Sequence, residues 1–191
     1  MEVLKQILRG LVSPVRYKHC LGVMEEAEKL AVCYNADADK ARTAGLLHDC
    51  VKELPPAKLA ELEQRYALKL DTVMKNEQKL LHAPIGAEYI KNEIKIYDDE
   101  IYDAVYYHTT AKADMCLLTK IIYTADFIEP NRSFEQVEAL RILAYNDIDR
   151  AVYAVLDMTI NKLVNRGSML HLDTINARNQ LLSNFRKQNQ I

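Results

Sequence analysis

The sequence predicts an all-α protein, and three observations lead to that prediction. Five glycines and five prolines occur among 191 residues, about half the usual share, so turns should be few and elements long. Apolar residues recur at steps of three and four along most of the chain, which is the period of an amphipathic helix. No stretch shows the alternation of apolar and polar residues that is typical of a strand.

Capping residues and prolines delimit the first helices. Ser13 followed by Pro14 is typical of an N-cap and a first helical turn, and predicts a helix through about Tyr34. Asp37 can cap a second helix. We expect that helix to pass through His48 and to end at about Leu54, because two consecutive prolines come next.

The later helices follow in close succession. We expect them over about residues 84–96, 98–108, 114–128, 134–145, 148–166 and 174–187. Acidic residues 98–100 favour the positive N-terminus of their helix. Asn146 or Asp147 should begin the longest of the later helices, and Gly167 should stop it. Residues 68–79 carry the weakest pattern and are expected to form a loop or a weak helix.

The chain shows no internal repeat, low-complexity tract or linker. We therefore expect one domain over residues 1–191. Its core should cover about residues 14–130, with C-terminal helices over about 134–190 packed onto that core.

The overall charge excludes some classes of partner. Twenty-five basic and 27 acidic residues give a net charge of −2. A protein that binds nucleic-acid polymers normally carries a basic field, so that role is disfavoured. No run of about 18 apolar residues occurs, which argues against a membrane partner. The first residues lack a signal-peptide core, and the four cysteines are scattered, so we expect reduced thiols and a cytoplasmic location.

Two acidic residues are expected inside apolar helices. Asp49 follows His48 and an apolar run over residues 44–47, and Asp126 lies within the apolar stretch 117–128. Burying a carboxylate costs several kcal/mol unless a cation or several donors compensate it. With histidines available to share a cation, these two acids indicate a metal site.

The order His19, His48-Asp49, Asp126 is that of the HD-domain metal phosphohydrolases. An HD dipeptide alone would be weak evidence, but the strings around these residues are more specific. They are RYKH at 16–19, LLHDCVKELP at 46–55, LHAPIGA at 81–87, YHTT at 107–110 and ADFIEPNR at 125–132. Together they resemble the YqeK-type HD family of bacterial symmetrical diadenosine tetraphosphate hydrolases, over about residues 17–179. Three departures are Ala111, where we expect glycine, Leu172, where we expect proline, and the pair Cys50-Val51, where we expect more aromatic or small residues.

The resemblance implies a helical HD-domain bundle with a metal centre. One ion would be held by His19, His48, Asp49 and Asp126. His82 and His108 would line either a second metal position, with Asp49 as a bridge, or the substrate phosphate; both roles stay open. Mixed nitrogen and oxygen ligands suit iron, manganese, cobalt or zinc. The resemblance favours iron, with one or two ions bound.

Substrate contacts follow partly from spacing and partly from the resemblance. Lys52 lies one helical turn beyond Asp49, and Arg132 follows Asp126 closely, so both should reach a bound phosphate. Thr109 offers a hydroxyl beside His108. The resemblance also assigns the segment Leu170, His171, Leu172, Asp173, Thr174 and Ile175 to the nucleoside, although Asp173 equally suits the N-cap of the last helix.

The predicted reaction is symmetrical hydrolysis of a dinucleoside polyphosphate, with diadenosine tetraphosphate and water giving two ADP. A metal-bound water attacks phosphorus, supported by Asp49 and Lys52. The partners are thus a small nucleotide and its ADP product. Alternatives are another HD nucleotide phosphohydrolase acting on mono- or triphosphates, a diiron oxygenase, and a nucleotide sensor without turnover. Amphipathic helices also supply candidate homodimer faces.

Overall fold

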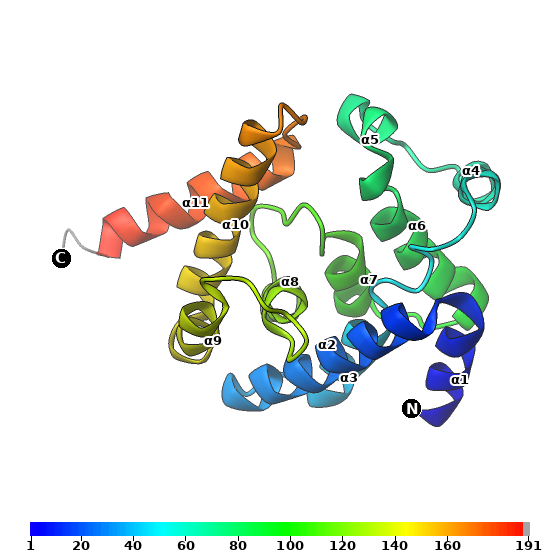
Figure 1. Cartoon of the computed structure of the whole chain (residues 1–191), viewed down its shortest axis with the longest axis horizontal. Coiled ribbons are helices and arrows are strands. Elements are labelled where there is room, and N and C mark those ends of the chain that lie inside the picture. The colour runs from blue at the N-terminus through cyan, green and yellow to red at the C-terminus, as the bar shows by residue number, and fades with distance from the viewer. Residues whose placement is uncertain (189–191) are drawn as a thin grey trace.

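The computed structural model describes residues 1–188, and every regular element in that range is helical (Figure 1). The α-helices are α1 (Glu2–Leu11), α2 (Pro14–Cys33), α3 (Ala38–Leu47), α4 (Pro56–Arg65), α5 (Thr72–Asn76), α6 (His82–Tyr89), α7 (Asp99–Tyr106), α8 (Leu117–Ile128), α9 (Val137–Asn146), α10 (Ile148–Asn165) and α11 (Leu172–Gln188). Two other segments are the 3₁₀-helix η1 (Gln78–Leu80) and the π-helix η2 (Ile90–Ile94). The predicted all-α class is therefore confirmed.

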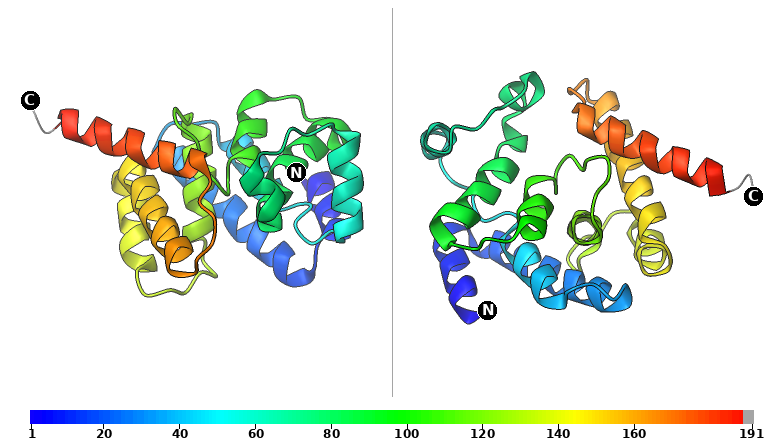
Figure 2. Two further views of the ribbon diagram at one scale, coloured as in Figure 1. Left: turned by 90° about the horizontal axis from the view of Figure 1, so that it is seen from above. Right: turned by 180° about the vertical axis from the view of Figure 1, so that it is seen from behind.

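The helices are arranged around α8, which is seen nearly end-on in Figure 1. Helix α2 packs on α3 and α8, and α7 packs on α3, α6 and α8. Helices α9 and α10 pack on the other side of α8, and α11 packs on α10. The views in Figure 2 show the C-terminal end of α11 extending away from the remaining helices. No helix within residues 1–188 is both long and apolar enough to cross a membrane.

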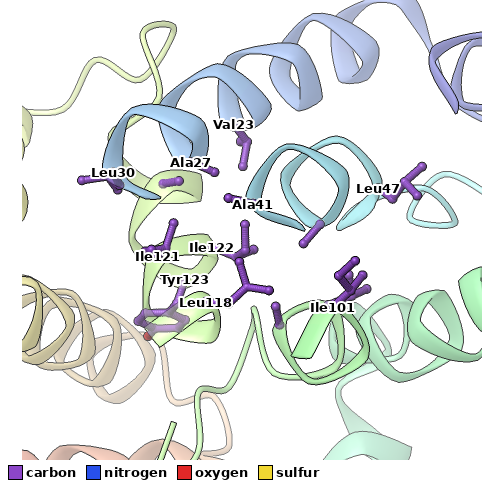
Figure 3. Packing of buried hydrophobic residues seen from close by; sticks show 14 of the residues in the cluster. Val23, Ala27, Leu30, Ala41, Leu47, Ile101, Leu118, Ile121, Ile122 and Tyr123 are labelled. Carbon is purple, nitrogen blue, oxygen red and sulfur yellow. The ribbon is translucent and has the colours of Figure 1, made fainter. Parts of the chain in front are cut away.

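The core lies between α2, α3 and α8 (Figure 3). Val23, Ala27 and Leu30 of α2 are buried against Ile121 and Ile122 of α8. Helices α2 and α3 approach closely because residue 45 is glycine. A Cβ atom there would lie 3.0 Å from the Cα of Met24, tighter than ordinary contact. This close packing places the N-terminal half of α2 beside the end of α3.

The predicted N-caps of α2 and α3 are confirmed. Ser13 Oγ accepts a hydrogen bond from the Arg16 N–H, and Asp37 accepts one from the Lys40 N–H. Asp98 and Asp147 cap α7 and α10 in the same way. Gly167 follows α10 with φ +64°, in the left-handed region where glycine is favoured.

The expected extent of the second helix is wrong, because α3 ends at Leu47 rather than near residue 54. The chain continues in tight turns, in which the Cys50 N–H donates to the Leu47 carbonyl and the Lys52 N–H to the Asp49 carbonyl. His48 Nδ1 bonds the Gly45 carbonyl, the acceptor that a continuing α-helix would offer to residue 49. The imidazole thus competes with the helix at the point where it ends.

The other expected helices begin within a few residues of the predicted positions. The helix expected from residue 84 is α6, which begins at His82 and continues directly into the π-helix η2. The weakly patterned segment 68–79 contains the short helix α5 and leads into η1, as expected of a loop or weak helix. Ala111, expected to be glycine, has φ +57°, so the backbone keeps the conformation that glycine would favour.

Candidate metal centre

Five elements bring six predicted residues to one place. His19 comes from α2, His48 and Asp49 from the end of α3, His82 from the first residue of α6, His108 from the turn after α7, and Asp126 from α8. All six are buried, with at most 9% of each residue exposed. Residues separated by up to about a hundred positions in sequence therefore form one polar cluster inside the helical core.

One half of the cluster surrounds Asp126 and one oxygen of Asp49. His19 Nε2 lies 3.1 Å from Asp126 Oδ1 and 3.8 Å from Asp49 Oδ2. His48 Nε2 lies 3.4 Å from Asp49 Oδ2 and 3.9 Å from Asp126 Oδ1. Two imidazole nitrogens and two carboxylate oxygens thus face a common point.

The other half surrounds the second oxygen of Asp49. His82 Nε2 lies 3.0 Å from Asp49 Oδ1, and His108 Nε2 lies 3.3 Å from it. The two imidazole nitrogens are 3.0 Å apart. Asp49 therefore presents one oxygen to each half, which is the arrangement that a bridging carboxylate requires.

Buried nitrogens without partners show that the cluster fits a metal ion. His19 Nε2 and His48 Nε2 are both buried and make no hydrogen bond. His48 Nδ1 donates to the Gly45 carbonyl at 2.8 Å, so its Nε2 carries a lone pair directed at carboxylate oxygens. An imidazole lone pair and a carboxylate oxygen that face each other repel unless a cation lies between them. Imidazole nitrogens with carboxylate oxygens are a donor set for a divalent metal.

The pKa values of the cluster residues favour the ionisation states that metal ligands need. Burial lowers the pKa of His48 and lowers that of His82 to about 4, so both rings are neutral at pH 7. Burial alone would raise the pKa of Asp126, but the neighbouring rings of His19 and His48 and the charge of Arg132 outweigh it and lower that pKa. Neutral imidazoles and ionised carboxylates are the forms that ligate metals.

Three cations lie at the edge of the cluster. Lys52 Nζ is 3.0 Å from Asp49 Oδ2, and Arg132 Nη2 is 2.6 Å from Asp126 Oδ1. Both were expected near these acids, although Lys52 reaches Asp49 through a tight turn rather than along a continuous helix. Arg16 Nη1, to which sequence reasoning gave no role, is 2.8 Å from Asp49 Oδ2. Its position three residues before His19 on α2 was the available signal.

A cavity of about 510 Å³ is lined by residues that flank the cluster residues in sequence, although none of the six cluster residues lines it. Its wall includes Thr109 and Phe127, the sequence neighbours of two cluster residues, and it continues to Phe134 and to α10. Of the predicted nucleoside segment, His171 and Thr174 line this cavity. Leu170, Leu172, Asp173 and Ile175 do not, and Leu172 is 69% exposed.

The expected cap of the last helix is wrong. Helix α11 begins at Leu172, so Asp173 lies inside its first turn. The Asp173 N–H donates to His171 Nδ1 at 3.2 Å, so the imidazole provides the cap. His171 Nε2 lies 2.7 Å from Asp71 Oδ2, which joins this segment to the start of α5.

Comparison with known proteins is in accord with this geometry. The family model of the HD domain matches residues 16–131, the part of the chain that holds all six cluster residues. The chain belongs to the HD domain family. It is 38% identical over 177 residues to "Bis(5'-nucleosyl)-tetraphosphatase, symmetrical" of Halalkalibacterium halodurans, covering 93% of this chain and 94% of the relative. A protein of the same name from Bacillus subtilis is 36% identical, with coverage of 88% and 90%.

A solved structure resembles this HD-domain protein over nearly its whole length. It is described as a predicted HD superfamily hydrolase involved in NAD metabolism, from Clostridium acetobutylicum. The TM-score is 0.92 at 41% identity, with 96% of this chain and 97% of that chain covered. The HD bundle and its C-terminal helices are therefore shared with this relative.

Proposed function

We propose that this HD-domain protein is a symmetrical bis(5'-nucleosyl)-tetraphosphatase that hydrolyses diadenosine tetraphosphate to two ADP. The observation that carries the proposal is the buried cluster of four histidines and two aspartates beside three cations. Relatives aligned over about nine tenths of the chain carry the name of that activity. The reaction is hydrolysis of a phosphoanhydride bond.

The cluster residues hold the metal that this reaction needs. His19, His48, Asp49 and Asp126 are the ligands of one ion, and His82 and His108 face the remaining oxygen of Asp49. A divalent ion held there supplies Lewis-acid polarisation of a phosphoryl oxygen and makes water nucleophilic at neutral pH. We propose iron as that metal, supported by the resemblance to the YqeK-type family.

The three cations bind the polyphosphate. Arg16, Lys52 and Arg132 are each partly exposed, with 26%, 32% and 39% of the side chain accessible. They can therefore turn from the carboxylates toward phosphate oxygens, and the guanidinium groups can do so with two parallel hydrogen bonds. Charge that develops on the phosphoryl oxygens is stabilised by these groups, and ADP leaves without a dedicated general acid.

The cavity beside the cluster receives a nucleoside. Its volume of about 510 Å³ lies within the range of about 300–1,000 Å³ typical of small-molecule sites. Phe127 and Phe134 offer aromatic rings to a base, while Thr109 and His171 offer polar groups to the sugar or the first phosphate.

A panel of substrates tests the proposal against its alternatives. Metal-loaded protein is incubated with diadenosine tetraphosphate, with AMP and with ATP, and products are resolved by chromatography while oxygen is monitored. We expect rapid turnover of the dinucleotide alone. Preferred release of phosphate from AMP or ATP would indicate another nucleotide phosphohydrolase, oxygen consumption an oxygenase, and binding without turnover a sensor.

A further inference from the structure

Glu129 is a buried carboxylate directly behind His19. It follows the last residue of α8 and is 2% exposed. Its Oε1 lies 3.1 Å from His19 Nδ1, the ring nitrogen that faces away from the metal cluster. A carboxylate is costly to bury at such a place unless its oxygens are compensated by donors.

Asn131 fixes the orientation of this carboxylate. Glu129 Oε2 accepts hydrogen bonds from the Asn131 N–H at 2.7 Å and from its side-chain amide at 2.8 Å. These two donors occupy one oxygen and leave Oε1 directed at His19, with Arg132 Nε farther away at 3.9 Å. Because an acceptor faces Nδ1, that nitrogen carries the hydrogen, and the lone pair of the ring is on Nε2.

Gly22 provides the space for the carboxylate. It lies in the middle of α2, one turn beyond His19, where glycine costs about 1 kcal/mol relative to alanine. A Cβ atom at residue 22 would lie 2.5 Å from Glu129 Oε2 and 3.2 Å from the Asn131 amide nitrogen. Helix α2 therefore has no side chain at the point where the Glu129 side chain, from the turn after α8, packs against it.

The other oriented histidines use neutral acceptors. His48 Nδ1 donates to the Gly45 carbonyl and His108 Nδ1 to the Val105 carbonyl, each one turn back on its own chain segment. His19 instead bonds a carboxylate that comes from a different element. A carboxylate acceptor fixes the ring and raises the basicity of the ligating nitrogen more strongly than a carbonyl does.

We infer that Glu129 is a positioning residue, which holds His19 in the tautomer and orientation needed to ligate metal. Gly22 leaves the space that the Glu129 carboxylate occupies. This inference rests on the metal centre of the proposed function. Glu129 contacts His19 at Nδ1 and not at the Nε2 that faces the cluster, so it acts through His19. Its loss lowers metal affinity by about 10- to 100-fold.

Two variants from opposite sides of the contact test the inference. In Glu129→Gln, the amide oxygen stays on the Asn131 donors and the amide N–H₂ faces His19 Nδ1, which favours the tautomer with hydrogen on Nε2. Gly22→Ala displaces the carboxylate while improving helix propensity. Each should lower Co²⁺ affinity, measured by titration, and shift the ¹⁵N resonances of His19 in metal-free protein away from the Nδ1–H pattern.

Matched controls separate positioning from folding. Gly10→Ala changes a helical glycine at which an added Cβ atom would have nothing within 4 Å, and Glu138→Gln changes an exposed acid on α9. Both should bind Co²⁺ as the wild type does. Wild-type affinity and an unchanged His19 tautomer in Glu129→Gln would overturn the inference. Normal Co²⁺ affinity without hydrolysis of any nucleotide by the wild type would overturn the proposed function alone.

Discussion

Asp49 makes more polar contacts within the cluster than its neighbours do. One oxygen faces His82 and His108, and the other faces His48 and Arg16. Burial raises the pKa of Asp49, but the neighbouring histidines outweigh that effect and hold the pKa well below its usual range. The carboxylate is therefore ionised at neutral pH, and it is available to ligate metal on both sides.

Removing one ligand should remove metal and activity together. His48→Ala or Asp126→Ala leaves the remaining buried groups without a complete donor set, so we expect loss of stoichiometric metal and of hydrolysis. Elemental analysis of purified protein gives the metal content. Asp39→Ala, which changes a 91% exposed acid on α3, is the control. Wild-type metal content in Asp126→Ala would contradict the ligand assignment.

Lys52 should affect the substrate and leave the metal in place. A hydrogen bond to a charged group contributes about 1.5–3 kcal/mol, so Lys52→Ala should lower kcat/KM by roughly 10- to 100-fold with unchanged metal content. Lys58→Ala removes an exposed lysine paired with Glu61 and should leave kcat/KM unaltered. Equal effects of the two substitutions would show that Lys52 has no particular role.

The low pKa of His82 predicts how acid destabilises the metal-free protein. Its folded-state pKa of about 4 lies below the ordinary value of 6.5, so the unfolded chain binds the proton more readily. The contribution of neutral His82 is complete above pH 6.5 and is lost as pH falls toward 4. The loss is at most about 3 kcal/mol.

Denaturant unfolding in the presence of a chelator, repeated between pH 4 and 7, measures this effect. Wild-type protein should lose free energy of unfolding across that range, and His82→Gln should show a shallower slope. Identical slopes for the two proteins would mean that His82 titrates normally in the folded state.

At the scale of elements, local signals placed most helices correctly. Ser13 and Asp37 cap the helices that they were expected to cap, and of the two candidates for α10 the cap is Asp147. Asp98 caps α7, at an N-terminus where only a favourable charge was expected. The early end of α3 could not be read from propensity, because it depends on the His48 ring bonding a backbone carbonyl. Helices α1 and α4 were not predicted, and each has a single buried residue, Leu8 in α1 and Leu62 in α4.

The cap of α3 offers a prediction about stability. Asp37→Ala removes the acceptor for the Lys40 N–H and should lower the free energy of unfolding by about 1 kcal/mol. Asp39→Ala, in the first turn of the same helix, should change it by less than about 0.5 kcal/mol. Chemical denaturation of both variants gives the comparison, and similar losses would argue against a specific cap.

At the scale of the whole molecule, the sequence predicted which residues form the metal cluster, but it did not predict which side chains hold them in position. The HD-family strings named the six cluster residues, and hydrophobic spacing could not have brought five elements together. Glu129 and Arg16 were within the quoted strings, yet their contacts with His19 and Asp49 depend on packing between distant helices. The cavity is likewise lined from both η1 and α10, an arrangement that no local pattern predicts.

Because the ligands come from α2, α3, α6, α7 and α8, metal binding should stabilise the entire bundle. A metal at a thousand times its Kd adds about 4 kcal/mol, which corresponds to a rise in Tm of roughly 10 °C for a chain of this size. Calorimetric scans with Co²⁺ and with chelator measure the shift. Asp126→Ala should show no such rise, and a rise equal to that of the wild type would place the metal elsewhere.

The central claim is symmetrical hydrolysis at the metal cluster, and product analysis in ¹⁸O-labelled water tests it most directly. Metal-loaded protein, purified without oxygen, is given diadenosine tetraphosphate, and the nucleotides are identified by mass spectrometry. We predict ADP as the sole nucleotide product, with one ¹⁸O on the β-phosphate of one molecule in each pair. ATP together with AMP would contradict the account.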